Sequence, residues 1–529
     1  MRPVFTAVLS RSISLVALLV LALSAAVATP ALAVGDRSRI TLDDADRLLL
    51  AGEYRKAADA YRDLADAVSP AGELAGRELA ASLHARRAIA FVKRDDVPAA
   101  IAAANQSVAA VASADAHATR AIVRFRAGRF VAATEDVERA GALSANGHPL
   151  AHLVLARLAL SEGRATDALA SAERSVAGES VLARAVRSDA LTVRADALDE
   201  LGRDREAVSS LDAALAAAPR TNELLIANLT AQLEFRRALI GRELYDVRQP
   251  APDVALPMTF ISGLAVVNMS MNGAPAVPFI VDTGAGISVV FSKYAKQSGF
   301  TARDEPAYAG AVGGNGRVPI RYGIAEKVAL GEVTVDAVPM IRIDWELPNF
   351  GGIIGMPLLR QFRTTFDYPS ARLRLEKSGS ATSTKPVRGS TPFRFIGQGV
   401  FVEATVNGKG PFNFEIDTGA ASPGVPMDDA VGAAVGLNPN APGVRKGRGQ
   451  GAAGTQDTAV HPNVRLAWAG LPEAKYDAIV QRISPARADR RDGESGITTE
   501  TELEGLIGFV ALREYSVTFD FATRMILLR

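Results

Sequence analysis

The 529-residue sequence contains no cysteine and only five histidines. The absence of cysteine excludes disulfide bonds, thiol catalysis, cysteine-ligated zinc and a lipoprotein anchor. The net charge is only +1, so we predict no surface for nucleic acid or an anionic membrane. Hydrophobic residues make up 48% of the chain, which is enough for a folded body, and the length predicts about two to four domains.

Long hydrophobic runs are also absent, except at the N-terminus. There Arg2 and Arg11 give a basic start, Ile13 to Val27 form a short apolar core, and Ala31-Leu32-Ala33 is a small-x-small cleavage signal. We therefore predict a signal peptide over residues 1–33, cleaved after Ala33, and a periplasmic or secreted protein without a stable membrane anchor. An uncleaved anchor is the alternative, but the apolar run is short for a membrane span.

Proline and strand-like alternation are rare between residues 38 and 245, where Ala, Leu, Arg and Glu predict helices. A Gly-x-x-x-x-Ala phrase begins at Gly52, Gly128, Gly163 and Gly202, with a weaker copy at Asp95, and the copies are 33 to 43 residues apart. This spacing resembles tetratricopeptide repeats. The resemblance implies about five helix pairs, stacked as an α-solenoid that binds a protein partner. An unspecified helical bundle is the alternative.

Metal ligands are scarce in this region. His148 and His152 are four residues apart, as two ligands on one helix would be. However, Gly147 and Pro149 place His148 at the start of a helix, and no third acidic ligand is evident. We therefore predict no metal site and no cofactor.

The C-terminal half contains one unit twice. Residues 279–285 spell Phe-Ile-Val-Asp-Thr-Gly-Ala, and residues 414–420 spell Phe-Glu-Ile-Asp-Thr-Gly-Ala. Each aspartate follows an Asn-Gly pair by ten residues, and each copy continues to an apolar Gly-x-x-Gly and a Thr-Phe-Asp. We therefore predict two lobes, residues 254–376 and residues 392–529, that share one strand order. Residues 377–391, rich in Ser, Thr and Gly, should join them flexibly.

The duplicated carboxylates predict a shared site. Two copies of a half-site meet at a pseudo-two-fold axis, so Asp282 and Asp417 should lie in contact. Two such carboxylates share a proton, so that one acts as acid and the other as base on a water molecule. Gly284 and Gly419 allow the tight turn beside each carboxylate. Thr283 and Thr418 have hydroxyls that can bond across the axis.

Each half resembles a retropepsin-type aspartic protease domain in its Asp-Thr-Gly-Ala, its later apolar-Gly and its Thr-Phe-Asp. The resemblance covers about residues 254–529 and implies two β-rich barrel lobes in one chain, hence a multidomain α plus β protein. It implies that Asp282 and Asp417 are catalytic, and that Thr283 and Thr418 brace the pair.

Glycine-rich segments lie between strand-like runs in both halves. Gly313, Gly314 and Asn315 are in the first, and Gly449 and Gly451 are in the second. By the same resemblance these residues belong to flaps, which are mobile hairpins that close over a peptide. An ordinary loop is the alternative for the first segment. The second also spells Gly-x-Gly-x-x-Gly, but no βαβ unit surrounds it, so no nucleotide site is predicted.

We therefore predict an exported aspartic endopeptidase that cuts a peptide or protein substrate recruited by the helical repeats. Two alternatives stay open. In one, the lobes are an inactive peptide clamp on a partner-binding scaffold. In the other, the turn-like segment from Ser422 to Pro426 marks a degenerate second lobe. The working pair would then be Asp282 from each of two chains.

Overall fold

The structure is a computed structural model of the whole chain. It describes residues 40–68, 73–145, 147–310, 317–344, 347–377, 387–451, 454–481, 483 and 501–529. From Leu42 to Arg529 the chain forms one compact unit. The predicted signal peptide lies outside the described residues, so export stays a prediction. Within the described ranges, no helix combines the length and the apolar character that a membrane span needs.

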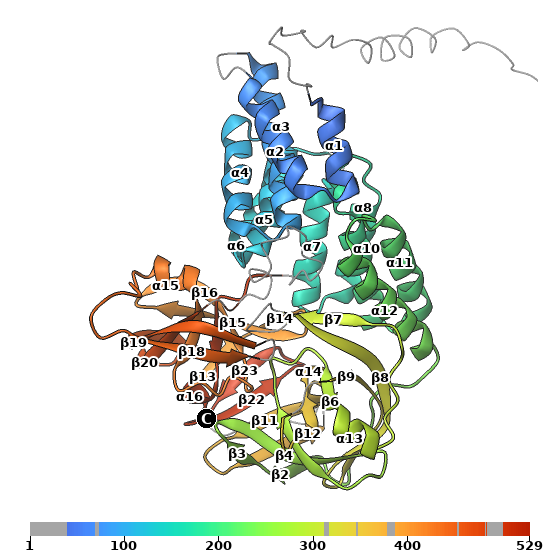
Figure 1. Cartoon of the computed structure of the whole chain (residues 1–529), viewed down its shortest axis with the longest axis vertical. Coiled ribbons are helices and arrows are strands. Elements are labelled where there is room, and N and C mark those ends of the chain that lie inside the picture. The colour runs from blue at the N-terminus through green and yellow to red at the C-terminus, as the bar shows by residue number, and fades with distance from the viewer. Residues whose placement is uncertain are drawn as a thin grey trace, which may run out of the picture. The chain divides into compact units, whose positions relative to one another are not determined.

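Helices make up the N-terminal part of this unit, as predicted (Figure 1). The helices are α1 (Leu42–Ala51), α2 (Tyr54–Ala67), α3 (Leu74–Lys93), α4 (Val97–Ala110), α5 (Ala114–Arg126), α6 (Phe130–Ala142), α7 (Pro149–Ser161), α8 (Ala165–Val176), α9 (Val181–Ala185), α10 (Arg187–Glu200), α11 (Asp204–Ala217) and α12 (Glu223–Leu239). Their assignment to the tetratricopeptide family remains a prediction.

The repeated phrase forms one kind of turn. Gly52, Gly128, Gly163 and Gly202 have φ angles of 86°, 72°, 73° and 67°, and Asp95 has 60° in the weaker copy. This left-handed conformation favours glycine because it has no Cβ. The turns join α1 to α2, α3 to α4, α5 to α6, α7 to α8 and α10 to α11.

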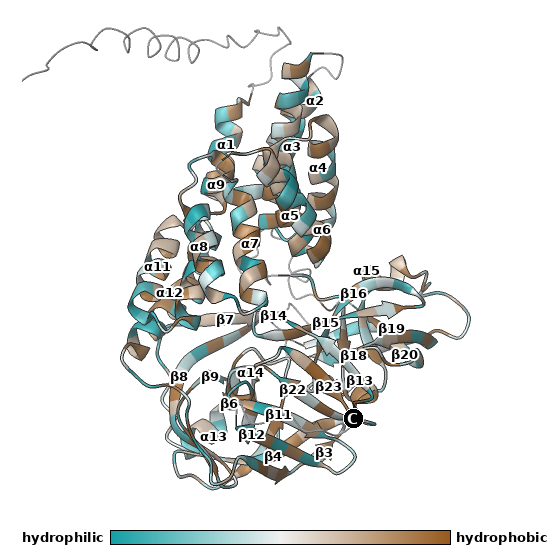
Figure 2. Cartoon of the chain, turned by 180° about the vertical axis from the view of Figure 1, so that it is seen from behind, coloured by the Kyte–Doolittle hydropathy of each residue, from teal (hydrophilic) through white to brown (hydrophobic). Residues whose placement is uncertain are grey.

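Small residues let the paired helices pack closely. The alanine that ends each copy of the phrase is fully buried, at Ala57, Ala100, Ala133, Ala168 and Ala207. Figure 2 shows hydrophobic and hydrophilic residues on the same helical ribbons, as expected for helices with one buried side. His148, which sequence analysis placed at a helix start, is the N-cap of α7 and accepts a hydrogen bond from Leu150 N.

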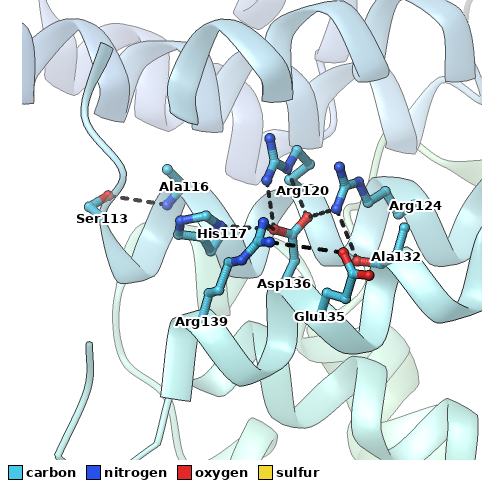
Figure 3. A network of polar contacts seen from close by, with 9 residues as sticks. All are labelled: Ser113, Ala116, His117, Arg120, Arg124, Ala132, Glu135, Asp136 and Arg139. Atoms are coloured by element: carbon cyan, nitrogen blue, oxygen red, sulfur yellow. Dashed lines mark hydrogen bonds and ion pairs between the residues drawn. The ribbon is translucent and has the colours of Figure 1, made fainter. Parts of the chain in front are cut away.

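A polar network fixes α5 against α6 (Figure 3). Asp136 on α6 is fully buried and lies 2.8 Å from His117 Nδ1, while Arg120 donates two hydrogen bonds to it, of 2.8 and 2.7 Å. Arg124 lies 2.7 Å from the same carboxylate and also donates to the carbonyl of Ala132. Buried carboxylates need such compensation, so this network fixes the two helices in register.

Two β-rich lobes follow the helices. Lobe 1 contains β1 (Asp246–Arg248), β2 (Asp253–Pro257), β3 (Thr259–Ile261), β4 (Leu264–Met271), β5 (Val277–Val281), β6 (Ser288–Phe291), α13 (Ser292–Gln297), β7 (Ala307–Gly310), β8 (Arg317–Leu330), β9 (Val333–Ile343), β10 (Gly352–Ile354), α14 (Met356–Leu359), β11 (Phe362–Asp367) and β12 (Arg372–Lys377). Lobe 2 contains β13 (Gly389–Pro392), β14 (Arg394–Ile396), β15 (Gly399–Val406), β16 (Lys409–Ile416), β17 (Val425–Asp428), α15 (Asp429–Ala434), β18 (Arg445–Gly451), β19 (Gly454–Trp468), β20 (Ala474–Gln481), β21 (Gly505–Ile507), α16 (Phe509–Leu512), β22 (Ser516–Asp520) and β23 (Met525–Leu528).

The two lobes have the same strand order, as the duplicated motifs predicted. In lobe 1 the order is β3-β4-β5-β10-β6-β9-β8-β7, and in lobe 2 it is β14-β15-β16-β21-β17-β20-β19-β18. Equivalent pairs also run in the same sense, since β5–β10 and β16–β21 are parallel whereas β6–β10 and β17–β21 are antiparallel. Further pairings, β4 with β8 and β15 with β19, close each set into a ring.

A third sheet joins the lobes. Its order is β13-β23-β22-β11-β12-β2, so each lobe contributes half of the strands. At its centre β11 pairs with β22, with Thr365 opposite Thr518, and the two hydroxyls lie 2.8 Å apart. These equivalent threonines mark the pseudo-two-fold axis.

Strand pairing differs from the sequence-based expectation at three places. Lobe 1 was predicted to begin at residue 254, but β1 pairs with β9, so the paired strands of this lobe begin at Asp246. The predicted linker 377–391 begins in β12 and ends in β13, because both ends pair in the joining sheet. Val425 and Pro426 form part of β17 and not of a turn, and β17 lies where β6 lies in lobe 1.

Candidate active site

Each aspartate of the repeated motif follows a strand in the middle of its lobe. Asp282 comes directly after β5, and its N–H donates to the carbonyl of Ile354, at 3.0 Å. Asp417 comes directly after β16, and its N–H donates to the carbonyl of Ile507, also at 3.0 Å. The apolar-Gly segments therefore position both aspartates in the same way.

The glycine of each motif makes room for the carboxylate of the other lobe. Gly284 N donates to Asp282 Oδ1, and Gly419 N donates to Asp417 Oδ1, both at 2.8 Å. A Cβ on Gly284 would lie 2.8 Å from Asp417 Cγ, and a Cβ on Gly419 would lie 2.5 Å from Asp282 Cγ. The two motifs therefore meet closely, and the structure brings Asp282 and Asp417 together.

The two carboxyl groups form a hydrogen bond with each other. Burial raises the pKa of Asp282 and raises that of Asp417 well above an ordinary aspartate. The charges of Asp282 and Glu415 raise the pKa of Asp417 further, whereas the backbone N–H of Gly284 lowers that of Asp282. The pair consequently shares one proton.

The two threonines form a reciprocal brace. Thr283 Oγ1 donates to the carbonyl of Ile416, at 2.6 Å, and accepts from Thr418 N, at 3.1 Å. Thr418 Oγ1 donates to the carbonyl of Val281, at 2.7 Å, and accepts from Thr283 N, at 3.0 Å. Both side chains are buried. These four hydrogen bonds fix one motif against the other, as the predicted hydroxyl brace requires.

Of the predicted flap residues, only Gly449 and Gly451 lie in the part of the chain that the structure describes. Gly313, Gly314 and Asn315 lie outside the described residues, between the paired strands β7 and β8. Gly449 and Gly451 belong to the β18–β19 hairpin, and a Cβ on Gly449 would meet only Gln481 and Thr458. Among the described residues, no contact connects these two glycines to the aspartates.

Sequence analysis missed two residues beside the pair. Burial, followed by the charge of Asp282, raises the pKa of Glu415 to about 8. Burial, followed by the charge of Asp417, also raises the pKa of Tyr368, whose hydroxyl is buried without a hydrogen-bond partner. Glu415 precedes Asp417 by two positions, which places both on one face of the strand. That spacing was the available signal.

The helical region docks onto lobe 2, which sequence analysis also missed. Arg129, in the turn between α5 and α6, donates to both oxygens of Glu504, at 2.9 and 2.8 Å. Asn413 Nδ2 donates to the carbonyl of Gly128, at 2.6 Å, and Asn413 N donates to Glu504, at 2.7 Å. Thr501 is buried against α5, where its hydroxyl donates to the carbonyl of Phe125, at 3.2 Å.

The helical region also contacts the base of the β7–β8 hairpin in lobe 1. Asn228 on α12 accepts a hydrogen bond from Tyr308 N, at 2.8 Å. Phe235 on the same helix stacks on Tyr322, with ring centroids 4.9 Å apart. The helical array therefore attaches to both lobes.

The sequence was compared with models of known protein families. A model of the aspartyl protease family matches residues 267–358 and 402–509, which contain Asp282 and Asp417 respectively. Both lobes match the aspartyl protease family. These two stretches are thus similar to aspartyl proteases, while the retropepsin-like form remains a prediction.

Comparisons with solved structures and with curated proteins give no further support for a family. The crystal structure of an aspartic proteinase from Irpex lacteus is similar at 13% identity, over 52% of this chain and 96% of that chain, with a TM-score of 0.36. This score is too low to support a conclusion. A search of curated proteins found no match. Among the described residues, no group of three or more His, Cys, Asp or Glu is arranged to hold a metal ion.

Proposed function

We propose that this protein is an aspartic endopeptidase that hydrolyses peptide bonds with a water molecule activated between Asp282 and Asp417. The contact between these two carboxyl groups, braced by Thr283 and Thr418, is the observation that supports the proposal. The family match in both lobes agrees with it.

In the proposed first step, the ionised Asp282 takes a proton from water as the water oxygen attacks the peptide carbonyl carbon. Asp417 gives its proton to the carbonyl oxygen, so a neutral gem-diol forms. In the second step, a gem-diol hydroxyl returns a proton to Asp417 while Asp282 protonates the amide nitrogen. The C–N bond then breaks, which releases a carboxylic acid and an amine and restores the pair.

The proposal extends to the other parts of the chain. The helical repeats would recruit a protein substrate or partner on the surface that does not contact the lobes. The N-terminal leader would direct the enzyme to the periplasm or to secretion. Both statements rest on sequence patterns, and each is tested apart from the chemistry, by pull-down and by fractionation of cells.

The central test compares the wild type with Asp282→Asn and Asp417→Asn on a peptide library. Each substitution should lower kcat/KM by about 10²–10⁴-fold, because asparagine cannot act as the acid or the base. A statine-type peptide, whose hydroxyl stands where the attacking water would be, should inhibit the wild type. Thermal melting curves serve as the control for folding.

The same assay separates the alternatives. If Asp417→Asn kept full activity while Asp282→Asn lost it, the working pair would lie between two chains. If the wild type bound peptides tightly but cut none between about pH 3 and pH 8, the lobes would be a binding clamp.

A further inference from the structure

The two lobes differ at one position close to the aspartates. Asp282 and Asp417 are 135 residues apart, and the same offset pairs Ile280 with Glu415. Each residue precedes its aspartate by two positions and therefore lies on the same face of its strand. Lobe 1 thus has an aliphatic side chain where lobe 2 has a carboxyl group.

The surroundings of Glu415 provide no partner for its carboxyl group. Its neighbours in register on the adjacent strands are Phe401 and Leu506, both apolar. Among the described residues, no arginine or lysine forms an ion pair with Glu415, and its side chain is mostly buried. An acidic side chain between two apolar residues is costly without a partner. This arrangement is expected where a ligand supplies the partner.

Lobe 2 also makes room for this carboxyl group. Gly399 stands at the position of Leu264 in lobe 1, and a Cβ there would lie 2.4 Å from Glu415 Oε1. The adjacent Gln398 has a buried Oε1 without a hydrogen-bond donor. Its turn approaches the loop after Asp282, since a Cβ on Gly286 would lie 3.4 Å from the carbonyl of Gly397. Two unpaired acceptors therefore lie near the carboxylate pair.

We propose that Glu415 determines substrate specificity, by binding a lysine or arginine side chain of the peptide on one side of the scissile bond. Ile280, at the equivalent position across the axis, would contact an aliphatic side chain on the other side of that bond. Gln398 would accept a further hydrogen bond from the bound ammonium or guanidinium group. This inference rests on the proposed peptidase activity.

The test uses matched peptides with either lysine or its uncharged isostere norleucine at one position beside the scissile bond. Mass spectrometry of a digested peptide library first identifies which side of the bond favours basic residues. We expect the wild type to show a kcat/KM at least about tenfold higher for the lysine peptide, as for a charged hydrogen bond in a partly desolvated site. That measurement needs no variant.

Two variants then assign the preference. Glu415→Gln should lower the lysine-to-norleucine ratio of kcat/KM by about tenfold. Ile280→Glu places a carboxyl group at the equivalent position, and it should create a second preference for lysine on the opposite side of the bond. Melting curves report whether each variant folds.

The outcomes are distinct. A wild type that cuts peptides without preferring lysine overturns the inference and leaves the peptidase proposal in place. An unchanged ratio in Glu415→Gln also overturns it, including when both rates fall equally, since Glu415 would then act on the aspartates. A wild type that cuts no peptide overturns the proposed function and this inference together.

Discussion

At the scale of single residues, the space beside the carboxylate pair is limited by two glycines. We expect Gly419→Ala to lower kcat/KM by about 10²-fold, because its Cβ would press on Asp282 and misplace it by a fraction of an ångström or more. Gly286→Ala is the matched control, since its Cβ would have no neighbour closer than 3.4 Å. Peptide hydrolysis by the two purified variants checks this prediction, and equal activities would contradict it.

The raised carboxyl pKa values predict that stability depends on pH. A folded state that holds protons more tightly is stabilised in full below the ordinary carboxyl pKa, near 4. This stabilisation is lost as the pH rises through the folded value, which is about 8 for Glu415.

We therefore expect the Glu415 carboxyl group to lower the free energy of unfolding between about pH 5 and pH 8, by up to about 1.4 kcal/mol per pH unit. Glu415→Gln removes this contribution, so its melting temperature should fall less than that of the wild type over the range. Calorimetry at pH 5, 6, 7 and 8 makes the comparison. Parallel curves for the two proteins would show that the carboxyl group is ionised in the folded state throughout.

At the scale of elements, the turn between α5 and α6 has two roles, because it closes a helix pair and also contacts lobe 2. Gly128→Ala should therefore destabilise the protein twice, through its left-handed backbone and through a Cβ only 1.9 Å from Asn413 Nδ2. Gly202→Ala is the matched control, with the same backbone conformation and nothing within 4 Å of its Cβ.

We expect Gly128→Ala to lower the free energy of unfolding by about 1–2 kcal/mol, as Gly202→Ala does, and by a further 1–3 kcal/mol for the lost contact. Denaturant titration of both variants measures the difference. Equal losses would mean that the docking of this turn contributes nothing to stability.

The repeated elements were predictable from sequence because their signals are local. Asp-Thr-Gly fixes a turn after a strand, and the recurring glycines fix the turns between helices. The contact between the helical region and lobe 2 was not predictable. It depends on Glu504 and Arg129, which are 375 positions apart, and no sequence pattern near either residue indicates the other. Strand β17 was missed because proline is disfavoured in strands, although Pro426 lies between two other strands of its sheet.

The candidate site was also predictable only in part. Asp282, Asp417 and both threonines occur in a motif whose duplication implies that the copies meet. Glu415 occurs in that motif too, but its meaning depends on the apolar neighbours Phe401 and Leu506, which only strand pairing brings beside it. The flap glycines were proposed by analogy alone, and no contact of the described ones supports that role.

At the scale of the whole molecule, the lobes are joined by more than the chain between them. They share the sheet in which β11 pairs with β22, and the helical array contacts both of them. We expect a protein cut at a protease site engineered between Lys377 and Val387 to remain one particle. Its two fragments should elute together from a sizing column and should retain the activity of the uncut chain.

The control for this prediction is the same cut protein in denaturant, where the two fragments should separate. Separation under native conditions would show that the joining sheet and the helical contacts are too weak to hold the lobes without the covalent connection.

The difference between Ile280 and Glu415 has a consequence for how a peptide lies in the site. A peptide has an N-to-C direction, whereas an assembly of two identical lobes looks the same after half a turn and accepts the chain either way round. Two lobes in one polypeptide are free to mutate independently. With an aliphatic wall on one side and an acidic wall on the other, this site distinguishes a sequence from its reverse, so a cleavage motif for this protein should not be a palindrome.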